Sequence, residues 1–385
     1  MAVARVSQYP LTHAAHLSSR IQFVLLGDLV VTFPFGRFWP MQSWKIAGVA
    51  ALLSAVSLSA LAAPAKVCVF DPLGKSGDVH RALEDYRLAM GKFGVELEIK
   101  TYVDELVAVE DFRAGQCEGM MATALRTRQF NATAASLDSV GASSIMRNGK
   151  IDMDASYDVV RRFITLLSSP KAASMMTVGQ YEISGIIPLG AAYSFVNDRQ
   201  ISTLQAAAGK RVAAFDYDKS QAELIQRVGA RPVAVNITNF APMFNNGNVD
   251  VLVAPALIYK PFELAKGIGT KGGVSRFPLT ILTYQMVIRK DKFPKDFGQH
   301  SREHFVASLD QAMTIARKAD KDIPEKLWLD PTSAEIDQYV TMMRQGRVLM
   351  ANKGIYDKQG LKLIKKIRCS IEPSAAECSE RTEMW

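Results

Sequence analysis

The sequence has few of the residues and spacings on which catalysis and metal binding depend. Among 385 residues there are five histidines, and His300 is followed by Ser301 instead of the glutamate that follows the first histidine of H-E-x-x-H. No G-x-S-x-G motif occurs, and no nucleophile has an identifiable base. The four cysteines show no C-x-x-C or Cys/His spacing. We therefore expect no enzymatic activity, no metal and no cofactor.

The sequence also lacks the basic runs of nucleic-acid-binding proteins. Its 46 Lys and Arg against 38 Asp and Glu give a formal charge of +8, without arginine-rich stretches or interleaved aromatic residues. Low-complexity segments and short repeats are absent as well. With 48% hydrophobic and 22% charged residues, the composition indicates a globular protein long enough for two domains, with no nucleic-acid partner.

Residues 41–62 predict a secretory signal peptide. Lys45 precedes an uncharged run of small and apolar residues that ends in Ala60-Leu61-Ala62, a typical cleavage signature. We expect the mature chain to begin at Ala63 in the periplasm, and residues 1–40 to be an extension read from too early a start codon. A membrane anchor is the alternative, because residues 46–63 carry no charge.

All four cysteines follow the predicted cleavage site. An even number in an exported chain favours two disulfides. Of the three possible connectivities we expect Cys68–Cys117, at the starts of two predicted neighbouring strands, and Cys369–Cys378, which closes a short loop around a loose tail.

The spacing of apolar residues predicts strands that alternate with helices. Val67, Val69 and Phe70 indicate a buried strand, residues 79–93 carry apolar side chains at helical steps of four and three, and residues 95–100 alternate as in a half-exposed strand. This alternation predicts an α/β fold with a mainly parallel sheet covered on both faces.

The same alternation recurs later in the chain, which predicts two α/β lobes. We expect lobe 1 at residues 63–187 and 283–330, lobe 2 at residues 188–282, and bracing C-terminal helices with a disulfide-pinned tail at residues 331–385. Strands near residues 186–196 and 280–290 are expected to cross between the lobes.

One segment resembles the second lobe of TRAP-type periplasmic solute-binding proteins. It runs from "GAAYSFVNDRQISTLQAAAGKRVAAFDY" through "GARPV" to "GNVDVLVAP". "KVCVFDPLGKSGD", "CEGMMATALRTRQFN" and the tail "GIYDKQGLKLIKKIRCSIEPSAAECSE" resemble a narrower branch of putative solute-binding proteins, also labelled as RND efflux-pump-associated (aminoglycoside resistance) proteins. The resemblance covers residues 63–380.

This resemblance implies a two-lobed, periplasmic-binding-protein-like (type II) fold with hinge-crossing strands. It also implies a monomeric receptor that closes on a small molecule and presents it to a membrane permease. An enzyme on the same fold, and an envelope accessory protein that docks on an efflux complex, are alternatives. The first would need a nucleophile or metal in the cleft, and the second an exposed apolar patch or a retained anchor.

The sequence departs from the family at one binding position. Transporter-linked members typically carry an arginine late in the strand after "GkrV" that clamps a substrate carboxylate, whereas this chain has Ala213 there and Arg211 two residues earlier. Arg126 and Arg128 are the expected substitutes, because they follow an apolar strand at the carboxyl end of the sheet, where ligands bind. An organic anion is therefore the favoured ligand, and an amine held by Asp71 and Asp216 is the alternative. Salt bridges to Asp138, Asp111 or the C-terminal region are the alternative role for this pair.

The other candidate ligand-binding residues share positions at predicted strand ends, in the following loops or at the crossing. Lys75 and Ser76 lie in a glycine loop before a helix, whose N–H groups favour an anion, although capping by Ser76 or Asp78 is an alternative. The loop lacks the first glycine of a phosphate-binding loop, which argues against nucleotide hydrolysis. The remaining candidates are Asp71, Tyr193, Asp216, Tyr217, Pro255 and Tyr259, and packing is the alternative role of Tyr259.

Overall fold

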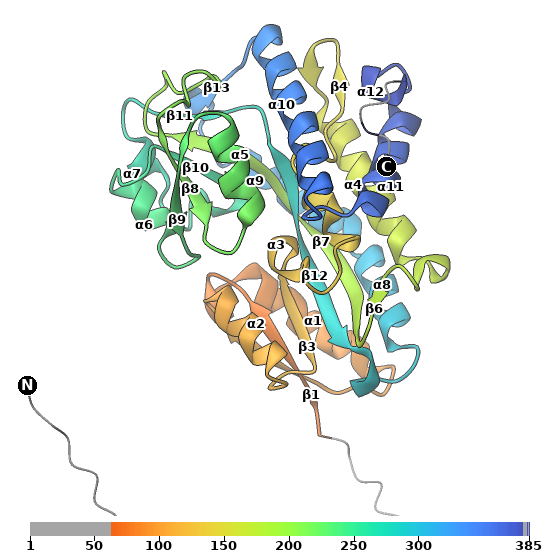
Figure 1. The fold of residues 1–385 in the computed structure, drawn as a ribbon. Coiled ribbons are helices and arrows are strands. Elements are labelled where there is room, and N and C mark those ends of the chain that lie inside the picture. Colours follow the sequence, from red (N-terminus) through yellow and green to blue (C-terminus); the bar gives the residue numbers. More distant parts are fainter. Residues whose placement is uncertain (1–62, 380–382, 384) are drawn as a thin grey trace, which may run out of the picture. The chain divides into compact units, whose positions relative to one another are not determined.

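A mixed sheet of eleven strands runs through the part of the chain that the computed structural model describes, residues 63–379, 383 and 385 (Figure 1). The predicted signal peptide and upstream extension, residues 1–62, lie outside the described residues. The strands are β1 (Ala65–Phe70), β2 (Leu97–Tyr102), β3 (Gly119–Thr123), β6 (Thr177–Val178), β7 (Tyr181–Val196), β8 (Arg211–Phe215), β9 (Arg231–Val235), β10 (Val251–Pro255), β11 (Gly273–Ser275), β12 (Thr280–Arg289) and β13 (Trp328–Leu329).

The helices that cover this sheet follow the same chain order. They are α1 (Asp78–Gly91), α2 (Glu105–Arg113), α3 (Ala124–Thr127), α4 (Met153–Ser168), α5 (Lys219–Arg227), α6 (Phe240–Asn245), α7 (Ala265–Ile268), α8 (Phe297–Ala307), α9 (Leu309–Asp320), α10 (Ser333–Asn352), α11 (Lys358–Ile371) and α12 (Ala376–Ser379). A separate hairpin pairs β4 (Met146–Arg147) with β5 (Lys150–Ile151). Within the described residues, no helix is long and apolar enough to cross a membrane.

The sheet has two parallel parts joined by antiparallel strands. Its main path is β2-β1-β3-β12-β7-β10-β8-β9. Strands β2, β1 and β3 are parallel to one another, as are β10, β8 and β9, whereas β12 and β7 run antiparallel to their neighbours on this path. The sheet is therefore mixed, and the expectation of a mainly parallel one was wrong, because the two longest strands pass between the lobes in opposite directions.

The long strands β7 and β12 carry the connection between the lobes. Strand β12 pairs with β3 of the first lobe, while β7 pairs with β10 of the second. Their register shifts between Leu282 and Thr283, next to Gly190 with φ of +124°, so the crossing contains an irregularity that only glycine accommodates easily. Gly185 permits a further close approach, since a Cβ there would lie 2.0 Å from the Phe305 ring of α8.

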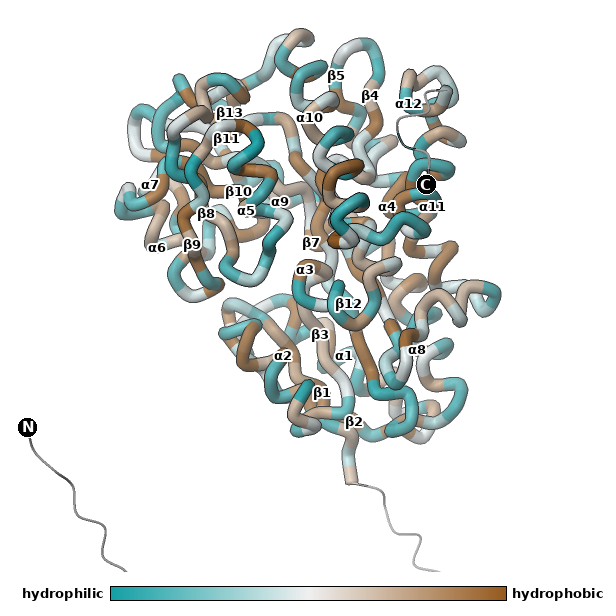
Figure 2. Tube along the Cα trace, viewed as in Figure 1, coloured by the Kyte–Doolittle hydropathy of each residue, from teal (hydrophilic) through white to brown (hydrophobic). Residues whose placement is uncertain are grey.

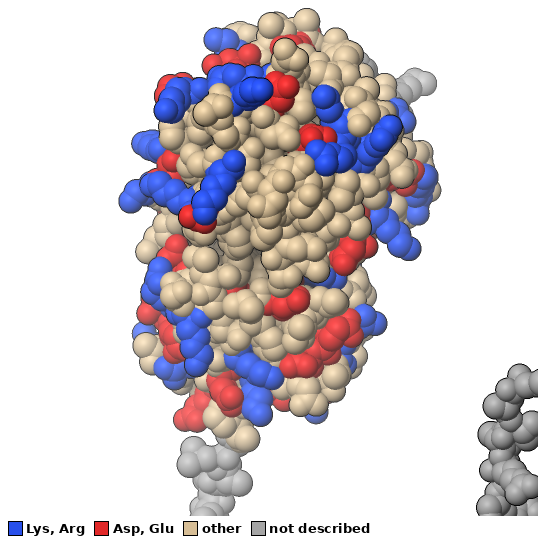
Figure 3. All heavy atoms as spheres, turned by 90° about the vertical axis from the view of Figure 1, so that its left-hand side faces the viewer, with Lys and Arg blue, Asp and Glu red and all other residues tan. Residues whose placement is uncertain are grey.

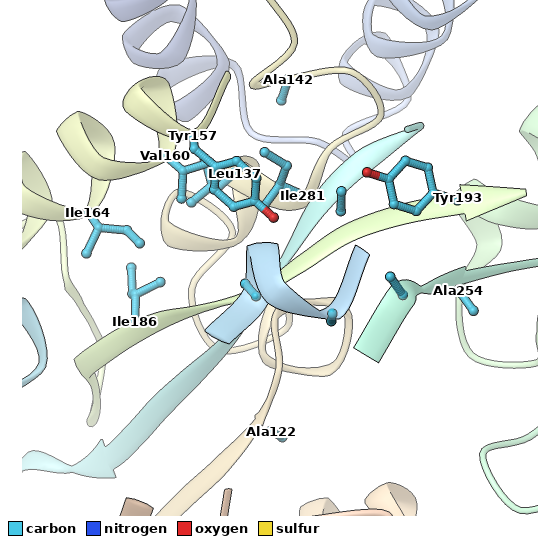
Figure 4. Packing of buried hydrophobic residues seen from close by; sticks show 14 of the residues in the cluster. Ala122, Leu137, Ala142, Tyr157, Val160, Ile164, Ile186, Tyr193, Ala254 and Ile281 are labelled. Atoms are coloured by element: carbon cyan, nitrogen blue, oxygen red, sulfur yellow. The ribbon is translucent and has the colours of Figure 1, made fainter. Parts of the chain in front are cut away.

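The main hydrophobic core lies where α4 and α9 pack on the crossing strands. Figure 4 shows Tyr157, Val160 and Ile164 of α4 near Ile186 of β7 and near Leu137. In Figure 2 hydrophobic segments concentrate along the packed strands, whereas the peripheral helices alternate between hydrophobic and hydrophilic positions. This distribution follows from burial of one face of each helix against the sheet.

The C-terminal segment is held by one of the two disulfides and by buried ion pairs. The structure joins Cys68 to Cys117 and Cys369 to Cys378, the pairing expected from the sequence. Near the second disulfide, Arg368 is buried and its Nε lies 2.6 Å from Glu377. These contacts fix the tail against α11 and α10.

Candidate functional site

A cavity of about 310 Å³ lies between the two lobes. Its wall includes the carboxyl ends of β1 and β3, the strands β8 and β10, and the middle of the crossing strands. Small-molecule sites in proteins occupy roughly 300–1,000 Å³, so the cavity suits one small ligand. On the face drawn in Figure 3, a largely uncharged band crosses the middle, with charged side chains gathered above and below it.

The wall of this cavity is mostly apolar and its charged members are all acidic. Apolar and aromatic side chains come from both lobes, among them Phe70, Leu125, Leu189, Phe215, Ile237 and Phe240. The acidic members are Asp71, Asp78, Glu105, Asp138 and Asp218. Among the described residues, no Lys or Arg contributes to this wall.

Three of the residues predicted to bind ligand line the cavity, namely Asp71, Tyr217 and Pro255. The others lie outside its wall: Lys75, Ser76, Arg126, Arg128, Tyr193, Asp216 and Tyr259. Lys75 and Ser76 are exposed, and the Ser76 hydroxyl donates to the Leu73 carbonyl at 2.8 Å.

Asp71 holds the loop between β1 and α1. Its two carboxylate oxygens accept from the backbone N–H groups of Leu73 at 2.9 Å and His80 at 3.0 Å. Gly77 leaves room for this carboxylate, because an added Cβ would lie 2.0 Å from it. Asp71 therefore satisfies an N–H group at the start of α1, the capping role that was the alternative for Ser76 or Asp78.

Arg126 pairs with a carboxylate that was not among the partners expected from the sequence. Its Nε lies 3.7 Å from Oε2 of the fully buried Glu105, and the centre of its guanidinium lies 3.2 Å from the ring centre of Tyr217. Because Tyr217 follows β8 of the second lobe, this stack joins the two lobes.

Glu105 receives hydrogen bonds from both lobes. Oε1 accepts from the backbone N–H of Thr123 at 2.7 Å and from its hydroxyl at 2.6 Å, and Oε2 accepts from the Tyr217 hydroxyl at 3.2 Å. Burial raises the pKa of Glu105, against the opposing effects of Thr123, Arg126 and Tyr217. Arg126 thus compensates a buried charge and stacks on Tyr217, while its Nε is enclosed without a hydrogen-bond partner among the described residues.

Arg128 has a different environment from Arg126. It is partly exposed, donates to the Ala135 carbonyl at 3.3 Å and lies over the Tyr356 ring at 4.8 Å. Its charge also acts on Asp138, whose oxygens accept from the Thr283 N–H at 2.8 Å and hydroxyl at 2.6 Å. Burial raises the pKa of Asp138 to about 7 despite these partners. The contacts with Ala135 and Tyr356 give Arg128 a structural role near the C-terminal region, without an ion pair to Asp138 within 4 Å.

The remaining candidate ligand-binding residues pack against other side chains or face solvent. The Tyr193 hydroxyl donates to Asp320 at 3.1 Å, and its ring meets Trp328 edge-on at 5.0 Å. Tyr259 is buried and stacks on Phe195 at 6.3 Å. Asp216 is exposed.

The position of the family's clamp arginine lies in the cavity wall, but the nearby arginine does not replace it. Ala213 lines the cavity. Arg211 instead forms an ion pair with Asp250 at 2.6 Å, and the Arg211 side chain contributes most to lowering the pKa of Asp250 to about 2. Arg211 therefore serves the second lobe and not the cavity.

Two polar groups in the wall have unused hydrogen-bonding capacity. Tyr284 of β12 is 2% exposed, and its hydroxyl has no partner among the described residues; burial raises its pKa and keeps the proton on the phenol. Asp218 is 8% exposed. Its Oδ1 accepts three hydrogen bonds, whereas its Oδ2 accepts none from the described residues. Glu105, Asp138 and Tyr284 were not predicted as site residues, since each lies in a stretch whose apolar pattern predicted only a helix, loop or strand.

Comparison with known proteins identifies close relatives of this chain. A family model described as "Solute-binding protein AdeT 1/2" matches residues 92–383. The probable solute-binding protein AdeT1 of Acinetobacter baumannii is 45% identical over 315 residues, which cover 82% of this chain and 100% of that protein.

Solved structures show the same fold at low sequence identity. A TRAP periplasmic solute-binding protein from Desulfovibrio salexigens with bound orotic acid matches with a TM-score of 0.64 and 16% identity, over 80% of this chain and 99% of that one. A TRAP protein from Ralstonia eutropha with bound (S)-2-acetolactate has a TM-score of 0.61 and 14% identity, over 80% and 99%. These matches confirm the two-lobed α/β fold predicted from the sequence.

Proposed function

Because the chain belongs to the family of solute-binding proteins AdeT 1/2, we propose that it captures one small molecule in the cavity between its lobes and presents it to a membrane transporter in the periplasm. The observation that carries this proposal is the cavity itself, whose wall includes side chains of both lobes and of the crossing strands. The alternative association with an efflux complex is not favoured by these matches, and the proposal includes no catalytic step.

Closure on a ligand would act through groups that meet only when the lobes face each other. Tyr217 of the second lobe already contacts Glu105 and Arg126 of the first, and the ligand would add contacts to both sides of the same cavity. A ligand that touches both lobes favours the closed population by its difference in affinity for the two states.

The charge of the ligand does not follow from the ligands of the solved structures. The solved TRAP proteins described above hold orotic acid and acetolactate. In this chain the clamp position is Ala213, and both predicted substitute arginines lie outside the wall. The organic anion expected from the sequence therefore lacks a cation to bind it within the described part of the cavity.

The proposed function is tested by blocking the cavity. Native mass spectrometry of the purified protein should detect one co-purified small molecule, and Ala213→Phe should remove it because the new ring fills the cavity. Ala234→Phe is the matched control, since Ala234 is exposed on β9 and lies outside the wall. Retention of the same molecule by Ala213→Phe with an unchanged unfolding temperature would show that binding occurs elsewhere.

A further inference from the structure

We propose that the cavity selects a largely apolar ligand that carries a protonated amine, and that the Asp218 carboxylate binds this amine. The proposal rests on the proposed function and specifies the chemical class of its ligand. It is carried by the capping of the helix N-termini, by the sign of the buried charge and by one carboxylate oxygen without a partner.

Three helices begin at the cavity, and the chain's own carboxylates occupy their N-termini. First-turn residues of α1, α2 and α5 line the wall. Asp71 accepts from an N–H group of α1, Asp104 accepts from the Leu106 N–H of α2 at 2.8 Å, and Asp218 accepts from the Ser220 N–H of α5 at 3.0 Å. Free N–H groups at helix N-termini are a common binding site for anionic ligands. Here the capping carboxylates occupy that place, so an anion would meet negative charge.

The buried charge of the wall is also negative. Asp71, Glu105, Asp138 and Asp218 are all buried. Arg126 compensates Glu105, and burial raises the pKa of Asp138 to about 7, so the negative charge of the wall rests mainly on Asp71 and Asp218, which have no guanidinium within 4 Å among the described residues. Attraction and repulsion between charges are much stronger at such buried positions than in water. An added carboxylate would therefore be repelled, whereas an ammonium group would be attracted.

Asp218 is the carboxylate that retains an accessible acceptor. Its Oδ1 accepts from the N–H groups of Ser220 and Gln221 and from the Ser220 hydroxyl at 2.5 Å, while Oδ2 has no hydrogen-bond partner among the described residues. Oδ2 is not fully enclosed, and Asp218 contributes to the cavity wall. An ammonium group can donate to Oδ2 without displacing the helix cap.

The apolar part of the ligand has a matching surface. Phe215 and Phe240 of the second lobe and Phe70 of the first all face the cavity. The unpartnered hydroxyl of Tyr284 adds a second polar anchor on the first-lobe side. A ring or alkyl chain between the lobes with its amine at Asp218 would use each of these groups.

Three probes with a common phenylethyl skeleton test this inference: phenethylamine, phenethyl alcohol and hydrocinnamate. Titration calorimetry of the purified protein at neutral pH should show the amine binding most tightly and the carboxylate most weakly. Asp218→Asn should reduce amine affinity by roughly tenfold, the value of a charge-assisted hydrogen bond, and leave the alcohol unchanged. Asparagine caps helices as well as aspartate does, so α5 should be retained.

Asp104→Asn is the matched control, because Asp104 also caps a helix and does not line the cavity. It should leave the order of the three affinities unchanged. Tightest binding by hydrocinnamate, or an amine preference that survives in Asp218→Asn, would overturn the inference. If no probe binds at millimolar concentration while mass spectrometry detects a cavity ligand, the ligand class is wrong and the solute-binding function stands; if neither is seen, both fail.

Discussion

Removal of Arg126 should destabilise the fold far more than removal of Arg128, although only Thr127 separates the two residues in the sequence. Arg126→Ala leaves the fully buried Glu105 without its cation. Removal of one partner of a buried ion pair costs roughly 3–5 kcal/mol, and the loss of the stack on Tyr217 adds about 1 kcal/mol. The three hydrogen bonds to Glu105 reduce this cost, so we expect a loss of about 3 kcal/mol.

Arg128→Ala supplies the comparison. Arg128 is partly exposed, donates one hydrogen bond and lies over Tyr356, so its removal should cost about 1 kcal/mol. Urea unfolding followed by circular dichroism measures the loss of unfolding free energy in both variants. The loss is read from the shift of the midpoint concentration, provided that the dependence of the free energy on urea concentration is unchanged.

A double-mutant cycle separates the ion pair from simple loss of packing. Glu105→Gln keeps the shape of the side chain and removes its charge, so it should partly rescue Arg126→Ala, with an interaction energy of roughly 1–3 kcal/mol. If the two substitutions add within about 0.5 kcal/mol, the ion pair does not contribute and this reasoning is refuted. Arg128→Ala combined with Glu105→Gln should be additive.

Two further predictions concern acid titration and the tail. Since burial raises the pKa of Asp138 from 3.8 to about 7, its protonation stabilises the folded state; this contribution is fully present below pH 3.8 and lost as the pH rises to about 7. The unfolding free energy of the wild type relative to Asp138→Asn should therefore fall by roughly 2–4 kcal/mol over that interval, and a pH-independent difference would contradict it. Replacement of Cys369 and Cys378 by Ser should lower the unfolding free energy by roughly 2–3 kcal/mol and release Glu377 from Arg368. Limited proteolysis should then cleave the tail first. Equal protection of the tail in both proteins would show that the ion pairs hold it without the disulfide.

The sequence by itself determined the alternation of strands and helices, the pairing of the cysteines and the family. Helices and strands follow from local periodicity, as in the apolar steps of α1 and in the strand before Arg126. The cysteine pairing and the family follow from distinctive residues and motifs. The direction of β7 and β12 was not accessible in this way, because a strand pattern does not record which neighbour it pairs with.

Only the tertiary structure decided what the two arginines do. Glu105 precedes Arg126 by a helix and a strand, and Tyr217 comes from the other lobe, so neither partner follows from the motif around the arginines. The charge of the cavity was likewise hidden, since Asp71, Glu105, Asp138 and Asp218 belong to four separate segments that each look like ordinary helix starts or turns. Periodicity fixes which face of an element is buried, whereas the sign of the charge in a cavity depends on which segments the fold brings together.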